Sequence, residues 1–177
     1  AASDVYKRQL MIDTKQSPFA FYSLNLAEDD VPTTAVRALF ADADKDLWLG
    51  TGSYGLARKD YETGVLSFFS HIPEFSDIPS VPTVNYIIQR KNGEVWFATY
   101  DGGILIYEKG EKVKVLTESD TPYLYSDCVS ALCEDSKGNC WVGCRGGMGI
   151  SLADGGHYRF GTLSFAGGGL ADWYHKQ

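Results

Sequence analysis

Four cysteines fall within a short stretch of the chain: Cys128, Cys133, Cys140 and Cys144. Thiolates bind zinc, but zinc sites are usually built from pairs of cysteines two residues apart, and this spacing is absent here. We expect free, buried thiols that fill a hydrophobic core, with a disulfide and a metal site as the alternatives. Pairing about the turn at residues 135–138 predicts Cys133 opposite Cys140, where a disulfide would form in an oxidising compartment.

Three aspartates at alternate positions, Asp42, Asp44 and Asp46, resemble the start of a calcium-binding loop. Such a loop needs glycine at its sixth position and glutamate at its twelfth, where this chain has Leu47 and Ser53. We therefore interpret the aspartates as part of a hairpin turn, and we predict neither a metal site nor a cofactor.

Catalytic motifs are not recognisable in the sequence. The histidines His71, His157 and His175 are scattered and share no motif with a carboxylate or a cysteine. The three glycines at residues 167–169 lack the Lys-Ser/Thr of a phosphate loop and are interpreted as a linker. A carboxylate pair for glycoside hydrolysis stays open, because the 23 acidic residues offer many pairs and none is singled out. We predict no catalytic residue and no enzyme activity in this chain.

These residues lie in three copies of one repeat, which begin at Val36, Val84 and Val129 and so start 48 and 45 residues apart. Each copy contains an apolar run, a polar turn, a second apolar run around a tryptophan, and two further β-rich runs separated by Gly-rich turns. Such a unit is a four-stranded antiparallel meander, and a period in the forties is typical of a β-propeller blade. We predict an all-β fold: a partial β-propeller with three four-stranded blades, fragments of the flanking blades and essentially no helix.

The repeat divides the chain into six segments. Residues 1–9 match a translated transposase adaptor used in sequencing libraries, and we expect them to be non-native. The other predicted segments are the end of a preceding blade with its linker (10–35), three blades (36–83, 84–128 and 129–168), and the truncated start of a next blade (169–177). The innermost strands are expected at 36–40, 84–88 and 129–133. Because the terminal blades would lack neighbours, we expect residues 10–177 alone to aggregate or oligomerise.

One tryptophan stands at the same place in each copy, twelve residues after the opening valine: Trp48, Trp96 and Trp141. A residue repeated in this way is best explained by packing in the gap between adjacent blades, where it buries about 150–250 Å². The alternative is that these indoles stack on a sugar or an aromatic ligand.

Candidate ligand-binding residues follow from the predicted topology. In a meander blade, the turn between the second and third strands lies on the same rim as the linkers between blades. This rim collects Tyr54, Tyr100, Asp101 and Arg145. Tyrosine and arginine are frequent binding anchors, and loops on a rigid scaffold often carry function. Ordinary solvated turns are the alternative at each position.

The overall charge narrows the range of partners. The formal net charge is −7, and the sequence pI is about 4.9. A negative chain is disfavoured as a partner of nucleic acid or of an anionic membrane. No apolar stretch approaches the about 18 residues of a membrane span.

The repeat motif resembles the two-component regulator propeller repeat. The resemblance is carried by V-x-A-L-x-x-D-x-x-x-x-L-W-L-G-T-x-x-x-G-L from Val36 and by V-S-A-L-C-E-D-S-K-G-N-C-W-V-G-C from Val129, and it covers about residues 19–172. The second copy departs from the pattern with Arg90 where an acidic residue is usual, and the third has one extra residue between Arg145 and Gly149.

This resemblance implies a fragment of the sensor region of a membrane-bound hybrid histidine kinase. Such a region would be periplasmic, bind a small ligand such as an oligosaccharide, and relay a signal to a kinase outside this chain. It implies as partners the remaining blades of the same full-length chain and a second copy of the receptor. A propeller enzyme (a lyase, a sialidase-like hydrolase or a quinoprotein dehydrogenase) and an interaction scaffold without a small ligand are the alternatives.

Overall fold

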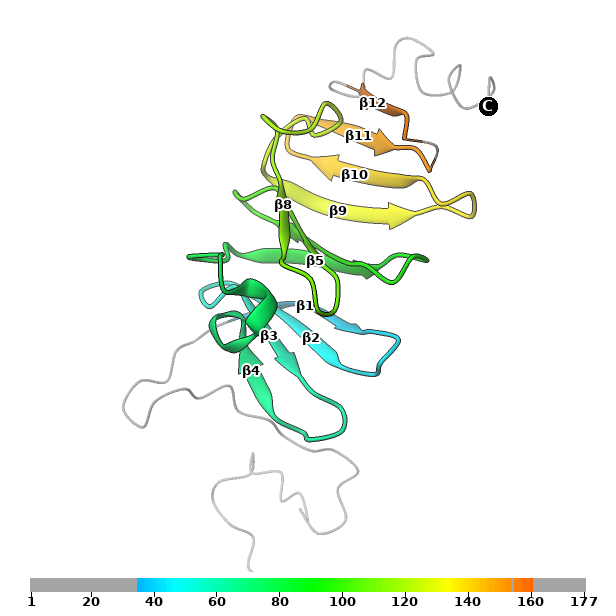
Figure 1. Ribbon diagram of the computed structural model, residues 1–177. Coiled ribbons are helices and arrows are strands. Elements are labelled where there is room, and N and C mark those ends of the chain that lie inside the picture. Colours follow the sequence, from blue (N-terminus) through cyan, green and yellow to red (C-terminus); the bar gives the residue numbers. More distant parts are fainter. Residues whose placement is uncertain (1–34, 154, 161–177) are drawn as a thin grey trace, which may run out of the picture. The chain divides into compact units, whose positions relative to one another are not determined.

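The computed structural model describes residues 35–153 and 155–160, and all structural statements below refer to this part of the chain. It contains three four-stranded antiparallel sheets, and in each sheet the strands follow one another in chain order (Figure 1). The predicted all-β fold is confirmed, since the only helical segments described are the short 3₁₀ turns η1 (Phe69–His71) and η2 (Pro73–Phe75). Predictions for residues 1–34, for the glycines at 167–169, for His175 and for residues 169–177 lie outside the described residues.

Each sheet is a meander of short strands. The first contains β1 (Val36–Ala41), β2 (Leu47–Thr51), β3 (Leu56–Lys59) and β4 (Leu66–Phe68). The second contains β5 (Val84–Gln89), β6 (Val95–Thr99), β7 (Ile104–Tyr107) and β8 (Lys114–Leu116). The third contains β9 (Val129–Glu134), β10 (Cys140–Cys144), β11 (Gly147–Ser151) and β12 (His157–Phe160). Strand β5 contacts both β1 and β9, so the first strands of the three sheets are neighbours, as expected for innermost strands (Figure 1).

The turn between the first and second strands has the same geometry in all three sheets. In the first sheet the amide of Asp42 donates to the carbonyl of Asp46, and the amide of Lys45 donates back to the carbonyl of Asp42. The residue directly before the last residue of the turn has a positive φ in each sheet: Lys45 (69°), Gly93 (94°) and Gly138 (85°). This is a type I turn followed by a left-handed residue, a common hairpin connection. The alternating aspartates therefore form a turn.

This turn contains one more residue than the predicted pairing of the cysteines assumed. Cys133 lies opposite Trp141, and Cys140 lies opposite Glu134, so the prediction that Cys133 faces Cys140 is wrong. None of the four cysteines forms a disulfide, but only Cys140 is buried, and Cys133 is exposed. Burial raises the pKa of the Cys140 thiol to about 12, which keeps it protonated as a core side chain. The expectation of buried thiols is therefore correct for Cys140 and wrong for Cys133.

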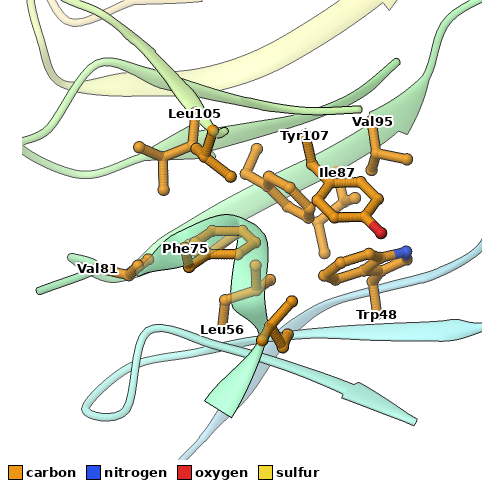
Figure 2. Close-up of a cluster of buried hydrophobic side chains, with 12 residues drawn as sticks. Trp48, Leu56, Phe75, Val81, Ile87, Val95, Leu105 and Tyr107 are labelled. Carbon is orange, nitrogen blue, oxygen red and sulfur yellow. The ribbon is translucent and has the colours of Figure 1, made fainter. Parts of the chain in front are cut away.

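The core between the first and second sheets is centred on Trp48, which is fully buried. Its ring lies 5.0 Å from that of Phe97 and 4.9 Å from that of Tyr107, both in the second sheet. Figure 2 shows Leu56 of the first sheet and Phe75 of the η2 turn in the same cluster. Phe75 is almost completely buried, which explains why the linker after β4 folds back as a 3₁₀ turn.

The second and third sheets share an equivalent core. Trp96 is 3% exposed and belongs to a cluster with residues of the third sheet, among them Val129, Leu132 and Val142. Leu124, in the linker between β8 and β9, is fully buried in the same cluster. The interval between the second and third sheets is thus filled by Trp96, by small and aliphatic side chains of the two sheets, and by Leu124 of the linker.

The indole N–H of each tryptophan donates to a carboxylate at the turn that precedes it. The pairs are Trp48 with Asp42 (2.8 Å), Trp96 with Glu94 (2.9 Å) and Trp141 with Asp135 (3.2 Å). In the second sheet Arg90 stands where the other copies have this aspartate, and Glu94 provides the acceptor instead. The departure of the second copy from the repeat pattern is therefore compensated within the same turn.

Arg90 has a different role, at the boundary between the second and third sheets. Its guanidinium lies 4.8 Å from the centre of the Trp96 ring and 3.4 Å from a carboxylate oxygen of Glu134. It also donates to the carbonyl of Gly138 at 2.9 Å. These contacts join the first turn of the second sheet to the first turn of the third. Polar interactions thus lie at the edge of the apolar core that the two sheets share.

Replacing Trp96 with Ala should lower the free energy of unfolding by about 3–5 kcal/mol, the usual loss for a large aromatic in a core. The buried position between two sheets is the reason, and urea unfolding of the full-length protein is the measurement. Tyr61 is 60% exposed, so Tyr61→Ala is a suitable control with an expected change within about 0.5 kcal/mol. A loss below about 1 kcal/mol for Trp96→Ala would contradict the packing role.

Candidate functional site

The turns between the second and third strands are tied to the residues that precede the innermost strands. The amide of Gly52 donates to the carbonyl of Ala35 at 3.0 Å, and the amide of Tyr100 donates to that of Thr83 at 2.9 Å. In the third sheet the amide of Arg145 donates to the carbonyl of Cys128 at 2.8 Å. Turns and inter-sheet linkers therefore share one rim, and Gly52, Tyr100 and Arg145 occupy equivalent positions on it.

Three of the four predicted binding residues have exposed side chains on this rim. Tyr100 is 55% exposed, and its neighbour Asp101 is also exposed. Arg145 is exposed on the equivalent turn of the third sheet. Tyr54 is only half-exposed, because its ring packs edge-on against Phe68 at 6.1 Å. The structure thus brings Tyr100 and Asp101 together on one turn, with Arg145 on the next sheet and Tyr54 partly withdrawn against its own sheet.

A buried threonine hydroxyl holds the turn that carries Tyr100 and Asp101. The Thr99 hydroxyl donates to the carbonyl of Gly103 at 2.9 Å and accepts from the amide of Gly102 at 2.9 Å. Thr51 makes the same two kinds of hydrogen bond in the first sheet, to the Gly55 carbonyl and from the Tyr54 amide. Both threonines are fully buried. The exposed residues of these turns are therefore presented on a fixed backbone.

The third sheet has cysteine, Cys144, in place of this threonine. A thiol is a weak donor and acceptor and would hold such a turn poorly. Here β10 and β11 are instead joined by the two residues Arg145 and Gly146, and Gly146 has a φ of 89° that suits a tight hairpin turn. The tryptophan of this sheet pairs with the ninth residue after it, whereas in the other sheets it pairs with the tenth. The prediction of one extra residue here is wrong, because the hairpin is one residue shorter.

The linker between β8 and β9 lies between the turns of the second and third sheets. The amide of Gly103 donates to the carbonyl of Asp127 at 2.9 Å. On the other side, a Cβ placed on Gly146 would lie 3.1 Å from the Tyr125 ring. Tyr125 is 36% exposed. We call the surface formed by Tyr100, Asp101, Tyr125, Asp127 and Arg145 the junction surface.

Sequence reasoning missed a β-bulge near the start of each innermost strand. The register shifts leave one extra residue in each strand, namely Arg37, Asn85 and Ser130. The Asn85 amide donates to the carbonyl of Val129 at 3.1 Å and so joins two innermost strands, while the Ser130 hydroxyl donates to the Gly143 carbonyl. Bulges re-aim side chains next to binding sites. A polar residue directly after the opening valine in all three copies was the available signal.

No cluster of three or more His, Cys, Asp or Glu residues in the described ranges is arranged to hold a metal ion. Among the same residues, no helix is long and apolar enough to span a membrane. The two described histidines contact residues other than the five of the junction surface. His71 interacts with the hydroxyl of Ser70, and the His157 ring lies 6.4 Å from that of Tyr123.

A family model described as two component regulator propeller matches residues 30–53 and 126–146 of this chain. These segments include the start of the first and third repeats, on which the sequence resemblance was based. The predicted resemblance to this repeat is therefore confirmed. A search of curated proteins finds no significant match.

Several solved structures are similar to this chain. Two are extracellular domains described as parts of two-component systems of B. thetaiotaomicron: one has a TM-score of 0.58 and 21% identity over 71% of this chain, the other 0.57 and 23% over 78%. A virginiamycin B lyase from Staphylococcus aureus has a TM-score of 0.57 and 17% identity over 80% of this chain. At these identities the likeness shows the fold alone, and the fold is that of a β-propeller.

The chain spans only a part of each of these proteins. It covers 17% and 18% of the two extracellular domains and 45% of the lyase. The activity and partners of the whole protein are therefore treated below as proposals.

Replacing Thr99 with Val should lower the free energy of unfolding by about 1–3 kcal/mol, because the amide of Gly102 loses its acceptor. Valine keeps the shape of the side chain, so the change reports on the hydroxyl. Hydrogen exchange at Gly102 should also become faster. Thr63 serves as a control, because its hydroxyl bonds to Asp60 and Val65 in an exposed turn where water can replace it: Thr63→Val should change stability by less than about 0.5 kcal/mol. Equal effects of the two substitutions would show that the hydroxyl does not hold the turn.

Proposed function

We propose that this chain is a segment of the extracytoplasmic sensor region of a two-component regulatory system. In this proposal the propeller binds a small ligand, an oligosaccharide, and relays the signal to a kinase outside this chain. The match to the two component regulator propeller model supports the proposal, as does the similarity to extracellular domains of two-component systems. The same similarity supports a periplasmic location. A second copy of the receptor is proposed as a partner on the resemblance alone.

The observation that carries the ligand-binding part of the proposal is the rigid rim with variable, exposed side chains. Equivalent backbone positions, each fixed by the same hydrogen bond to a linker, carry glycine in the first sheet, Tyr100 in the second and Arg145 in the third. The first two sheets keep the threonine that holds the turn, and all three sheets differ in the residue that faces solvent. Such a division between scaffold and surface is typical of proteins that recognise ligands through loops.

A propeller enzyme is the second candidate, favoured by the similarity to virginiamycin B lyase. Against it, the turns after β2, β6 and β10, which are the rim turns of the described residues, carry no histidine: His71 lies in η1 and His157 begins β12. A propeller without a small ligand, acting as an interaction scaffold, is the third. A membrane span and a kinase core encoded downstream in the full gene would favour the sensor, and an open reading frame that ends after the last blade would favour the alternatives.

The remaining blades of the full-length chain are proposed to cover one face of the first sheet. Val36 is 42% exposed and Leu39 is 63% exposed. Their counterparts in the second sheet, Val84 and Ile87, are buried and belong to the core shared with the first sheet. The third sheet repeats the pattern with two residues buried against the second sheet, Val129 and Leu132. In the next two sheets, the residues equivalent to Val36 and Leu39 thus pack on the preceding blade.

In the full-length protein, Leu39→Ala should lower the free energy of unfolding by about 2–5 kcal/mol, because the substitution removes the contacts that the leucine makes with the covering blade. Val65 is 56% exposed and lies next to a turn, so Val65→Ala should have an effect within about 0.5 kcal/mol. Urea unfolding of both variants is the measurement. A small effect of Leu39→Ala, similar to that of the control, would mean that no blade covers this face.

The sensor proposal predicts that the full-length protein binds an oligosaccharide. A glycan array followed by isothermal titration calorimetry is the measurement, and Tyr100→Ala should weaken binding at least tenfold because an exposed aromatic anchor is lost. Tyr61→Ala, on the opposite rim, should change the dissociation constant by less than twofold. Absence of binding to every glycan on the array, or turnover of a bound compound, would contradict a sensor of this ligand class.

A further inference from the structure

Two exposed tyrosines lie on adjoining segments of the rim, although they are far apart in the repeat. Tyr100 is 55% exposed on the turn after β6, and Tyr125 is 36% exposed in the linker before β9. The hydrogen bond from the Gly103 amide to the Asp127 carbonyl (2.9 Å) joins these segments directly. Gly103 has a φ of 68°, and a Cβ there would lie 1.9 Å from the Leu116 carbonyl oxygen, so the turn that makes this bond needs glycine at this position. The two tyrosines are therefore held on one surface.

Tyr125 of this linker also contacts the third sheet. The Tyr125 ring lies against Gly146, where a Cβ would come within 3.1 Å of it. Gly146 has a φ of 89° and immediately follows Arg145, whose amide is fixed to the Cys128 carbonyl. The turn of the second sheet, the linker and the turn of the third sheet thus form a continuous surface across the boundary between two blades.

The charges on this surface distinguish among ligand classes. Asp101 and Asp127 lie on the side of the second sheet, and Arg145 lies on the side of the third. The Asp127 carboxylate also accepts from the Glu118 amide at 2.6 Å, which brings a further acidic residue to the linker. The acids outnumber the cation, and the whole chain has a formal net charge of −7. A polyanionic ligand would therefore be repelled, while a neutral ligand rich in hydroxyl groups finds both donors and acceptors.

We infer that the junction surface binds a neutral oligosaccharide of several units, with Tyr125 as a binding residue beside Tyr100. The inference rests on the proposed function and specifies its ligand. Sugar rings have an apolar face of C–H groups that packs on an exposed aromatic ring, and their hydroxyls bond to carboxylates and guanidinium. Because the contacts come from two blades and the linker between them, a single sugar unit reaches only some of them, and a longer chain reaches more.

A matched control is available on the opposite rim. Tyr61 is 60% exposed, close to the value for Tyr100, but it lies in the turn after β3 beside Lys45, whose ammonium is 4.9 Å from its ring centre. The Tyr61 amide donates to the Asp46 carboxylate, in the turn between β1 and β2. Tyr61→Ala therefore removes an exposed tyrosine without touching the junction surface.

The test is calorimetric titration of the full-length protein with neutral hexasaccharides (cellohexaose, maltohexaose and xylohexaose), their monosaccharides, and a galacturonic acid hexamer. We expect at least one neutral hexasaccharide to bind at least tenfold more tightly than its monosaccharide and than the acidic hexamer. Tyr125→Ala should weaken this binding at least tenfold, and Tyr125→Phe, which keeps the ring, less than threefold. Tyr61→Ala should have less than a twofold effect. Circular dichroism and thermal unfolding establish that each variant is folded.

The outcomes separate this inference from the proposal on which it rests. If a neutral hexasaccharide binds but Tyr125→Ala leaves its affinity unchanged, the junction surface is wrong and the sensor proposal stands. If only the acidic hexamer binds, the neutral ligand class is wrong and oligosaccharide sensing stands. If the monosaccharide binds as tightly as the hexasaccharide, the extended junction surface is wrong, and the ligand of the proposed function becomes a single sugar unit. If no sugar binds, both the inference and the ligand part of the proposed function are overturned.

Discussion

The structure depends on the burial of the apolar face of each sheet against a neighbouring sheet, and in the described residues the second sheet is covered on both faces. A short four-stranded meander has too little core of its own, so its apolar side chains need a second sheet. Trp48 meets this need between the first two sheets, where it contacts Phe97 and Tyr107 and is fully buried. The indole N–H would be costly to bury without a partner, and the Asp42 carboxylate accepts it at 2.8 Å. One residue thereby links the hairpin turn, the strand and the inter-sheet core.

The second copy shows how this arrangement tolerates change. Arg90 replaces the acceptor aspartate, yet the indole of Trp96 keeps a carboxylate partner because Glu94 lies in the same turn. Arg90 then reaches the third sheet through Glu134 and Gly138. The constraint is thus on the interaction, an acceptor for a buried indole, rather than on the residue type at one position. The departure from the repeat at Arg90 thus adds a contact between sheets.

Packing at the strands leaves the rim free to differ from blade to blade. The backbone of each rim turn is fixed by a hydrogen bond to the residues that precede its innermost strand, and in the first two sheets a buried threonine hydroxyl holds the turn as well. Side chains such as Tyr100 and Arg145 therefore contribute little to the core and are available for recognition. The linkers are part of this surface as well, since Leu124 is buried between sheets while the neighbouring Tyr125 faces solvent at the rim.

The sequence alone determined the all-β fold, the number of sheets and the place where each innermost strand begins. These features depend on the period of apolar residues and on the spacing of the tryptophans, which are local and repeated. It also predicted which turns share a rim, and so placed Tyr100, Asp101 and Arg145 on it. Strand register was different, because one residue with positive φ in a turn shifts every pair beyond it. For that reason the sequence paired Cys133 with Cys140, while the structure pairs Cys133 with Trp141.

Only the tertiary structure decided which residues of different blades meet. The hydrogen bond from the Asn85 amide to the Val129 carbonyl, and the contact of Tyr125 with Gly146, depend on how neighbouring sheets and linkers approach each other. No single repeat contains that information, because the partners lie in different repeats or in linkers of unequal length. The exposure of a side chain is equally non-local: Leu39 and Ile87 occupy the same place in the repeat, but only Ile87 is covered by a sheet in the described part of the chain. Local pattern thus specified the blade, and packing between blades specified which side chains are exposed on the rim.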